Sequence, residues 1–88
     1  MTTIDSEIIE LFKRNPQQMV RVKFIFDIKG EYFRSNTIQA DNDLGIFSSL
    51  VHSKRRDGDK YIMDATVQSF LCEKLANECI TLLEIRKV

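Results

Sequence analysis

The sequence has few of the residues that interrupt regular structure or carry special chemistry. Among its 88 residues there are three glycines, one proline, two cysteines and no tryptophan. Disordered and collagen-like chains are rich in glycine and proline, so this scarcity excludes both classes. Hydrophobic residues make up 43% and charged residues 30%. This composition predicts a single compact domain that spans residues 1–88.

The sequence also lacks an excess of either charge and any long hydrophobic run. Thirteen basic side chains balance thirteen acidic ones, so no net field draws the protein to nucleic acid or to an anionic membrane. No stretch reaches the roughly 20 apolar residues of a membrane span, and the start MTTIDSEIIE has no signal-peptide pattern. We therefore expect a cytoplasmic protein without a membrane partner.

The two cysteines do not suit a disulfide. Cys72 and Cys79 fall in the segment with the clearest helical pattern, where their Cα atoms would lie roughly 10 Å apart along the axis. A disulfide needs Cα atoms within about 7 Å of each other. We predict two free thiols, as is usual in a reducing cytoplasm.

Recognisable catalytic and metal-binding motifs are missing as well. His52 is the only histidine, and its basic neighbours indicate an ordinary surface position. A zinc site needs closely spaced Cys or His pairs, and neither Asp41/Asp43 nor Asp57/Asp59 begins a calcium loop. The glycines are isolated, which excludes the common phosphate-binding loops. We expect no catalytic activity, no metal and no cofactor.

What the sequence does contain is periodicity. Ile4, Ile8, Leu11 and Phe12 have the spacing of one helical face. Thr3 can cap this predicted N-terminal helix, and Asn15-Pro16 ends it. Residues 19–28 alternate apolar and polar side chains, which predicts a strand with one buried face.

A turn at Lys29-Gly30 predicts that residues 31–40 return as a second strand, so that residues 19–40 form a β-hairpin. Its register stays open: a two-residue loop sets Phe26 opposite Phe33, whereas a three-residue loop sets Val22 opposite Ile38. A slip of one residue exchanges the faces of the second strand.

Later segments are less uniform. Residues 44–53 favour a short helix, but a strand stays open for them, because Asp57-Gly58 is typical of a type I′ hairpin turn before a strand at about residues 60–66. From residue 67 to at least residue 77, apolar side chains recur every three or four positions, which predicts an amphipathic helix. Whether residues 80–88 extend this helix or form an edge strand stays open.

These elements predict an α+β fold with an N-terminal helix, an antiparallel sheet built on the β-hairpin, and a long C-terminal helix packed on one sheet face. The even-numbered positions from Val20 to Ile28 should form the sheet side of the core. The residues expected to cover it are Ile8, Leu11, Phe12, Phe70, Leu71 and Leu75.

Two surface features are candidates for binding. Basic side chains on the solvated face of the first strand, together with an exposed tyrosine, could hold a phosphate backbone and stack a base, and Ile25 with Ile38 could form an apolar strip. The acidic residues Asp57 and Asp59 directly follow the basic run of residues 54–56. The candidate partner-binding residues are Arg21, Lys23, Ile25, Tyr32, Arg34, Ile38, Lys54, Arg55 and Arg56.

A compact chain without catalytic motifs favours a small non-enzymatic module that binds a larger protein partner and regulates or inhibits it. In size it resembles the small antagonist proteins that phages and mobile elements encode. The alternative is a small nucleic-acid-binding protein that uses the basic patch on the sheet face and loop. An enzyme ranks third, and a homodimer is an open possibility for the apolar strip.

Overall fold

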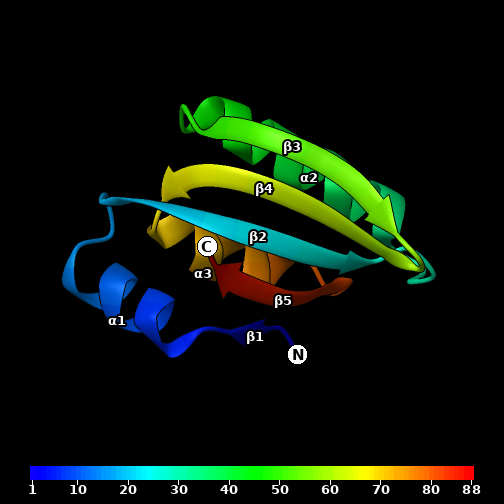
Figure 1. The fold of residues 1–88 in the computed structure, drawn as a ribbon, viewed down its shortest axis with the longest axis horizontal. Coiled ribbons are helices and arrows are strands. Elements are labelled where there is room, and N and C mark those ends of the chain that lie inside the picture. Colours follow the sequence, from blue (N-terminus) through cyan, green and yellow to red (C-terminus); the bar gives the residue numbers. More distant parts are fainter.

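The computed structural model describes residues 1–88 and contains three helices and a five-stranded sheet. Helices α2 and α3 lie behind the sheet in Figure 1, and the face turned to the viewer is open. Along the chain the elements are β1 (Thr3–Ile4), α1 (Ser6–Arg14), β2 (Met19–Asp27), α2 (Phe33–Ile46), β3 (Leu50–Asp57), β4 (Lys60–Gln68), α3 (Phe70–Glu78) and β5 (Leu82–Lys87).

The strands lie in the order β1-β5-β2-β4-β3. Within β5-β2-β4-β3 every neighbouring pair is antiparallel. Helix α2 connects β2 to β3 and helix α3 connects β4 to β5, so each connection passes over one intervening strand. This is the split βαβ connectivity of ferredoxin-like folds. The predicted α+β class is therefore confirmed, and β1 adds a short parallel strand outside β5.

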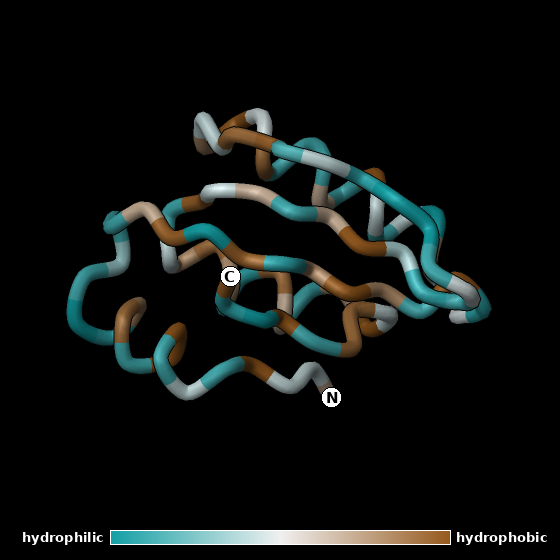
Figure 2. Tube along the Cα trace, in the orientation of Figure 1, coloured by the Kyte–Doolittle hydropathy of each residue, from teal (hydrophilic) through white to brown (hydrophobic).

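The predicted first strand is confirmed as β2, and its alternation positions the core. Val20, Val22, Phe24 and Phe26 are buried and belong to one hydrophobic cluster of 17 residues. Figure 2 shows apolar and polar positions alternating along this strand. Of the predicted even-numbered set, only Ile28 lies beyond the strand and is half-buried.

The predicted N-terminal helix is confirmed as α1, but its predicted start is wrong, because Thr3 and Ile4 pair with β5 as strand β1 and the helix begins at Ser6. Most of the residues expected to cover the core do so. Phe12 and Phe70 are half-buried and pack against the hydrophobic cluster. The fully buried members of the expected covering set are Ile8, Leu11, Leu71 and Leu75.

The predicted hairpin of residues 19–40 is wrong, because the second strand is replaced by a turn and helix α2. This helix has little apolar surface of its own and is fixed by tertiary contacts. The buried Asn36 side chain accepts hydrogen bonds from the backbone and hydroxyl of Thr81. Gly30 lets the turn before α2 approach the same residue, since a Cβ there would lie 2.3 Å from Thr81 Cγ2.

The predicted short helix over residues 44–53 is also wrong. Helix α2 ends at Ile46, and β3 begins at Leu50. Between them Ser48 adopts a φ of 54°, a left-handed conformation that prevents the helix from continuing. The second half of the predicted segment therefore belongs to the sheet.

The hairpin turn before the predicted strand at residues 60–66 is confirmed, and it joins β3 to β4. Asp57 pairs with Lys60, so the loop consists of Gly58 and Asp59. Only Gly58 has a positive φ, of 63°. A type I′ turn needs a positive φ at both loop residues, whereas a type II′ turn needs it only at the first, so the predicted turn type is wrong.

The predicted long C-terminal helix is wrong in its length. Helix α3 has nine residues and ends at Glu78, after which Cys79 takes an extended conformation. Leu82 to Lys87 form strand β5 beside β2. A register shift between Ile25 and Phe26 lets Leu82 and Ile85, three positions apart, both face the core, so this strand reproduces the spacing of a helical face.

Candidate protein-binding surface

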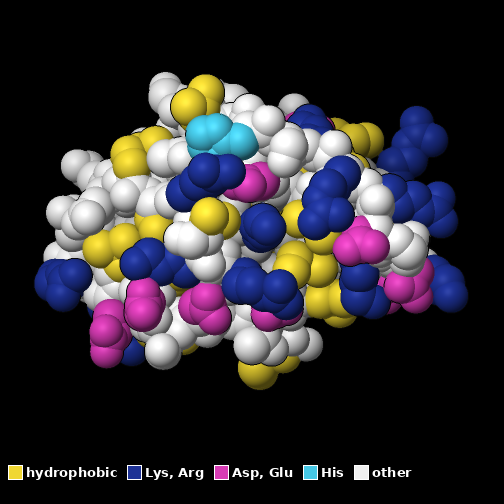
Figure 3. Space-filling model, viewed as in Figure 1, with side chains coloured by type: hydrophobic (Ala, Val, Ile, Leu, Met, Phe, Trp, Pro, Cys, Tyr) yellow, Lys and Arg dark blue, Asp and Glu magenta, His cyan; other side chains and the backbone are white.

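The open face of the sheet is formed by residues that alternate with the core positions. Figure 3 shows this face, with basic, acidic and apolar side chains intermixed over the strands. No phenylalanine or tyrosine lies on it, because Phe24, Phe26 and Tyr61 belong to the opposite, helix-covered side. The open face therefore offers mainly charge and hydrogen-bonding groups, and His52 is its only aromatic side chain.

Arg21 and Asp64 form the central ion pair of the open face. Arg21 Nε and one terminal nitrogen each donate to Asp64 at 3.0 Å, so the pair is bidentate. Asp64 is only 7% exposed although it lies on the solvated side. The Arg21 guanidinium lowers the pKa of the Asp64 carboxyl, with smaller effects from His52 and Lys23, so this carboxylate is charged at neutral pH.

The open face also carries a second paired arginine, Arg86, and one lysine without an ion pair, Lys23. Arg86 donates two hydrogen bonds to Glu84, at 3.1 and 2.8 Å, and this contact raises the pKa of Arg86. His52 Nε2 lies 2.7 Å from the Thr66 hydroxyl. Lys23, at the centre of β2, makes no ion pair and is half-buried.

Ile25 lies on the open face, as predicted, but it is only 7% exposed. It is flanked by Ile62 on β4 and by Glu84 on β5, and these cross-strand neighbours shield it from solvent. The predicted exposed apolar strip is therefore wrong. Ile38, its other predicted member, is 51% exposed but lies on α2.

Strand β3 is the most accessible strand of the sheet. All eight of its residues are exposed, and it lies at the end of the strand order, so its outer edge has no neighbour. Lys54, Arg55 and Arg56 occupy its second half. Lys54 pairs with Asp41 of α2 at 2.7 Å, Arg55 lies 3.7 Å from Asp57, and Arg56 donates to the Gly58 carbonyl.

The structure brings together only part of the predicted basic patch. Arg21, Lys23 and Arg55 share the open face, because Arg55 lies opposite Ile62 and that residue lies opposite Ile25. Tyr32 and Arg34 are separated from them, since Tyr32 precedes α2 and Arg34 lies within it. Their predicted place depended on the second strand of the hairpin, which does not form.

Asp64 and its contact with Arg21 were missed in the sequence. Counting outward along both strands from the hairpin turn at residue 58 pairs Asp64 with Ser53. The position of Asp64 in the sheet could therefore have been predicted from the sequence. Its low exposure has no local signal, because it depends on β2, β3 and β4 lying side by side.

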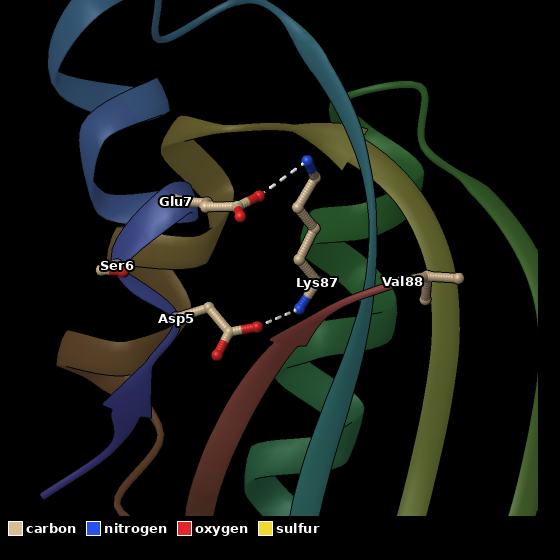
Figure 4. Close-up of a pocket in the computed structure, with 5 residues that line it drawn as sticks. All are labelled: Asp5, Ser6, Glu7, Lys87 and Val88. Carbon is tan, nitrogen blue, oxygen red and sulfur yellow. Dashed lines mark hydrogen bonds and ion pairs between the residues drawn. The ribbon is translucent and has the colours of Figure 1, made fainter.

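Two small cavities lie near the termini, away from β3. In Figure 4, Lys87 bridges the start of α1: its backbone N–H donates to Asp5 at 2.6 Å and its Nζ lies 2.9 Å from Glu7. This cavity measures 370 Å³, and a neighbouring one of 440 Å³ also contacts Glu7 and Lys87. Both are lined mainly by charged and polar groups, whereas small-molecule sites are mostly apolar.

Both cysteines are free and buried, as predicted for their redox state. Burial raises the pKa of the Cys72 thiol to about 12 and that of Cys79 to about 11. Neither sulfur is therefore a thiolate at neutral pH. No group of three or more His, Cys, Asp or Glu side chains is placed to hold a metal ion, and no helix is long and apolar enough to cross a membrane.

Comparison with protein-family models, with curated proteins and with solved structures gives no match to this chain. The connectivity of the sheet describes its architecture, and a shared architecture does not define a function. The features of this chain that bear on its function are therefore the open face and β3.

Proposed function

We propose that this chain is a small non-enzymatic protein-binding module that regulates or inhibits a larger protein partner. The observation that carries the proposal is β3, an exposed edge strand of eight residues beside an open sheet face. An edge of this kind presents a row of backbone donors and acceptors, which proteins use to pair with a strand of another chain. As part of this proposal, the small size of the chain suggests that a phage or mobile element encodes it.

The composition of the open face supports a protein partner over nucleic acid. Single-stranded nucleic acid is usually bound by stacking its bases on aromatic side chains, and this face has no phenylalanine or tyrosine. Phosphates are bound by unpaired cations, whereas Arg21 and Arg86 each hold a carboxylate through two hydrogen bonds. Both contacts would compete with phosphate binding.

Nucleic-acid binding remains the second candidate function because one observation favours it. Lys23 and Arg56 make no ion pair, and Arg55 has only a 3.7 Å contact with Asp57. These cations could contact phosphates through a patch on the sheet face and on β3. The patch is small for this purpose, and it lacks the tyrosine that the sequence placed beside it.

The chemistry of the side chains supports a non-enzymatic role. His52 is an exposed residue whose hydrogen bond goes to Thr66, and no cysteine or serine lies within hydrogen-bonding distance of its ring. The pKa of each thiol is raised, which opposes nucleophilic chemistry at neutral pH. A binding role requires none of these groups.

Capture of partners from cell lysate with matched variants tests the proposal. The test variant combines Lys23→Glu with Arg55→Glu on the open face. The control combines Lys13→Glu with Arg14→Glu at the exposed end of α1 and makes the same change in net charge. We expect a specific protein, retained after nuclease treatment, to bind the wild type and the control but not the test variant.

Two results would oppose this expectation in different ways. Loss of every captured protein on nuclease treatment would favour nucleic-acid binding. Equal capture by the test variant and the control would show that neither the open face nor β3 contacts the partner.

A further inference from the structure

The outer edge of β3 is an unpaired hydrogen-bonding surface at the end of the sheet. No strand lies beyond it in the sheet, and every residue from Leu50 to Asp57 is exposed. The opposite edge of the sheet is the two-residue strand β1, which offers too few backbone groups for a ladder. Of the two edges, only β3 is long enough to receive another strand.

The basic side chains of β3 project to both faces of the sheet at this edge. Arg55 lies opposite Ile62, on the open face, whereas Lys54 and Arg56 lie opposite Met63 and Tyr61, on the helix-covered face. A strand that pairs with residues 54–56 meets a cation on either face. Acidic side chains at consecutive positions of that strand would therefore all lie near positive charge.

The first two residues of β3 are apolar and accessible. Leu50 is 61% exposed and Val51 is 38% exposed. A bulge between Val51 and Ser53 separates this apolar pair from the basic half. The edge thus presents two short blocks of different chemistry along one strand.

A second copy of this chain is a poor occupant of the edge. Paired antiparallel about its centre, β3 would place Lys54 beside Ser53 and Arg55 beside His52 of the other copy, and a parallel arrangement would align the basic runs. Like charges on adjacent strands oppose the parallel arrangement, and the antiparallel arrangement gives the cations at residues 54–56 no carboxylate directly opposite. Charged edge strands are also a common protection against self-association. The same charge attracts an acidic strand.

We infer that the outer edge of β3 binds an extended acidic segment of a partner protein by strand addition. This inference rests on the proposed protein-binding function and specifies the partner's chemistry. Backbone hydrogen bonds to β3 supply the pairing, and Asp or Glu residues opposite Arg55 and Arg56 supply the selectivity. Lys54 contributes less, because Asp41 of α2 already pairs with it at 2.7 Å. Apolar residues of the same segment cover Leu50 and Val51.

Titration of the full chain with synthetic peptides tests the inference. The probe is a capped peptide of six residues, with three consecutive glutamates followed by a threonine and two valines. A matched peptide carries lysine in place of each glutamate. We expect the acidic peptide to bind about tenfold or more tightly than the lysine peptide, with affinity falling between about 50 and 200 mM salt because the pairing charges are exposed.

Variants of the protein locate the peptide on β3. Arg55→Glu with Arg56→Glu should weaken the acidic peptide about tenfold or more, whereas Lys13→Glu with Arg14→Glu should change its affinity less than about twofold after allowance for net charge. If the reversed variant unfolds, Arg55→Thr with Arg56→Thr removes the charges and keeps strand-forming residues. That variant should still lose about threefold or more.

N-methylated peptides separate strand addition from charge attraction alone. Methyl groups on alternate nitrogens of the acidic peptide remove either the donors that face β3 or those that face solvent, and only the first set should abolish binding. Equal effects of the two sets, or indifference to the Arg55 and Arg56 variants, would overturn the inference. A preference for a thymidine oligonucleotide over the acidic peptide would overturn it in favour of nucleic acid.

The lysate experiment keeps the two proposals separate. If the acidic peptide does not bind but a protein partner is still lost with the Lys23 and Arg55 variant, the protein-binding function stands and the strand-addition inference fails. If no protein is retained by the wild type after nuclease treatment, the function itself fails.

Discussion

Asp64 shows how the open face is organised at the level of single residues. Its carboxylate is only 7% exposed on a face without a helix layer, and an ionised group in such a place needs strong hydrogen bonds. Arg21 supplies two of them from β2, where it lies two residues before Lys23, the residue directly opposite Asp64. The pair therefore stabilises the alignment of β2 and β4 and places a fixed positive group on the face.

The Arg21 contact predicts a pH dependence of stability. Because the folded state lowers the pKa of Asp64, ionised Asp64 stabilises the fold above about pH 4, and this contribution is lost as pH falls through the lower folded pKa. Urea unfolding should show Asp64→Asn less stable than wild type at pH 7, with the gap narrowing toward pH 3. Asp41→Asn, at a surface ion pair, should cost less than about 1 kcal/mol at pH 7. A gap for Asp64→Asn that is independent of pH would contradict the account.

Core and surface truncations should differ sharply. Phe24 is completely buried, and Phe24→Ala should reduce the free energy of unfolding by roughly 3 to 5 kcal/mol. Ile38→Ala, at a residue that is 51% exposed, should change it by about 0.5 kcal/mol or less. Ile25→Ala should fall between them, because Ile25 is buried by neighbouring side chains rather than by a helix. Equal losses for Phe24→Ala and Ile38→Ala in chemical denaturation would contradict the placement of the core.

At the scale of elements, local patterns predict only those parts that local interactions determine. Strand β2 follows from its alternation, and the β3–β4 turn follows from Gly58. Helix α2 was missed because its buried positions include Asn36, Ala40 and Asp43, which form no apolar stripe. Its contacts to Thr81 and to Lys74 of α3 come from distant segments, which no local pattern contains.

The C-terminal strand was ambiguous for a related reason. An alternating strand buries every second residue, but the register shift beside β5 buries Leu82 and Ile85 instead. That spacing continues the helical pattern of α3. The bulge forms only when β5 lies against β2, so propensity could not separate helix from strand.

Residues of the candidate surface were placed correctly only where the element that carries them was predicted correctly. Arg21, Lys23 and Ile25 were placed on the correct face because β2 was recognised, and the cationic run at residues 54–56 was recognised as an accessible basic cluster. Tyr32 and Arg34 were misplaced with α2. That the basic run lies on an unpaired edge could not be predicted, since strand order is a property of the whole sheet.

Two glycines give a matched test of the elements that contain them. Gly58 has a positive φ in the hairpin turn. Gly45 lies in the last turn of α2, where an added Cβ would have no atom within 4 Å. Gly58→Ala should destabilise the protein by roughly 1 to 2 kcal/mol. Gly45→Ala should stabilise it by roughly 0.5 to 1 kcal/mol. Thermal unfolding of both variants would check the signs, and a destabilisation by Gly45→Ala equal to that by Gly58→Ala would contradict the helical assignment.

The molecule as a whole carries balanced charge, but the longer edge of its sheet, β3, carries a cluster of positive charge. Thirteen basic and thirteen acidic side chains cancel, and many are paired across the surface. The basic half of β3 is a local exception at the longer edge of the sheet. Specific binding by this protein should therefore depend on a local contact rather than on a net field.

Binding to nucleic acid should be weak for the same reason. We expect dissociation constants no tighter than about 10⁻⁴ to 10⁻⁶ M for single-stranded or duplex nucleic acid at physiological salt, the range of non-specific binding. Titration at several salt concentrations would measure both the affinity and the number of phosphate contacts. A submicromolar, salt-sensitive complex that disappears in Arg55→Ala with Arg56→Ala would instead make nucleic-acid binding the leading function.

Residue-by-residue amide hydrogen exchange would show whether β3 pairs with an added strand. NMR spectra with and without the acidic peptide would report the backbone N–H groups of β3. We predict that alternate amides between Ser53 and Asp57, those that face away from β4, become protected when the peptide binds, while Thr3 and Ile4 of β1 do not change. Binding that leaves every β3 amide unprotected would contradict strand addition at this edge.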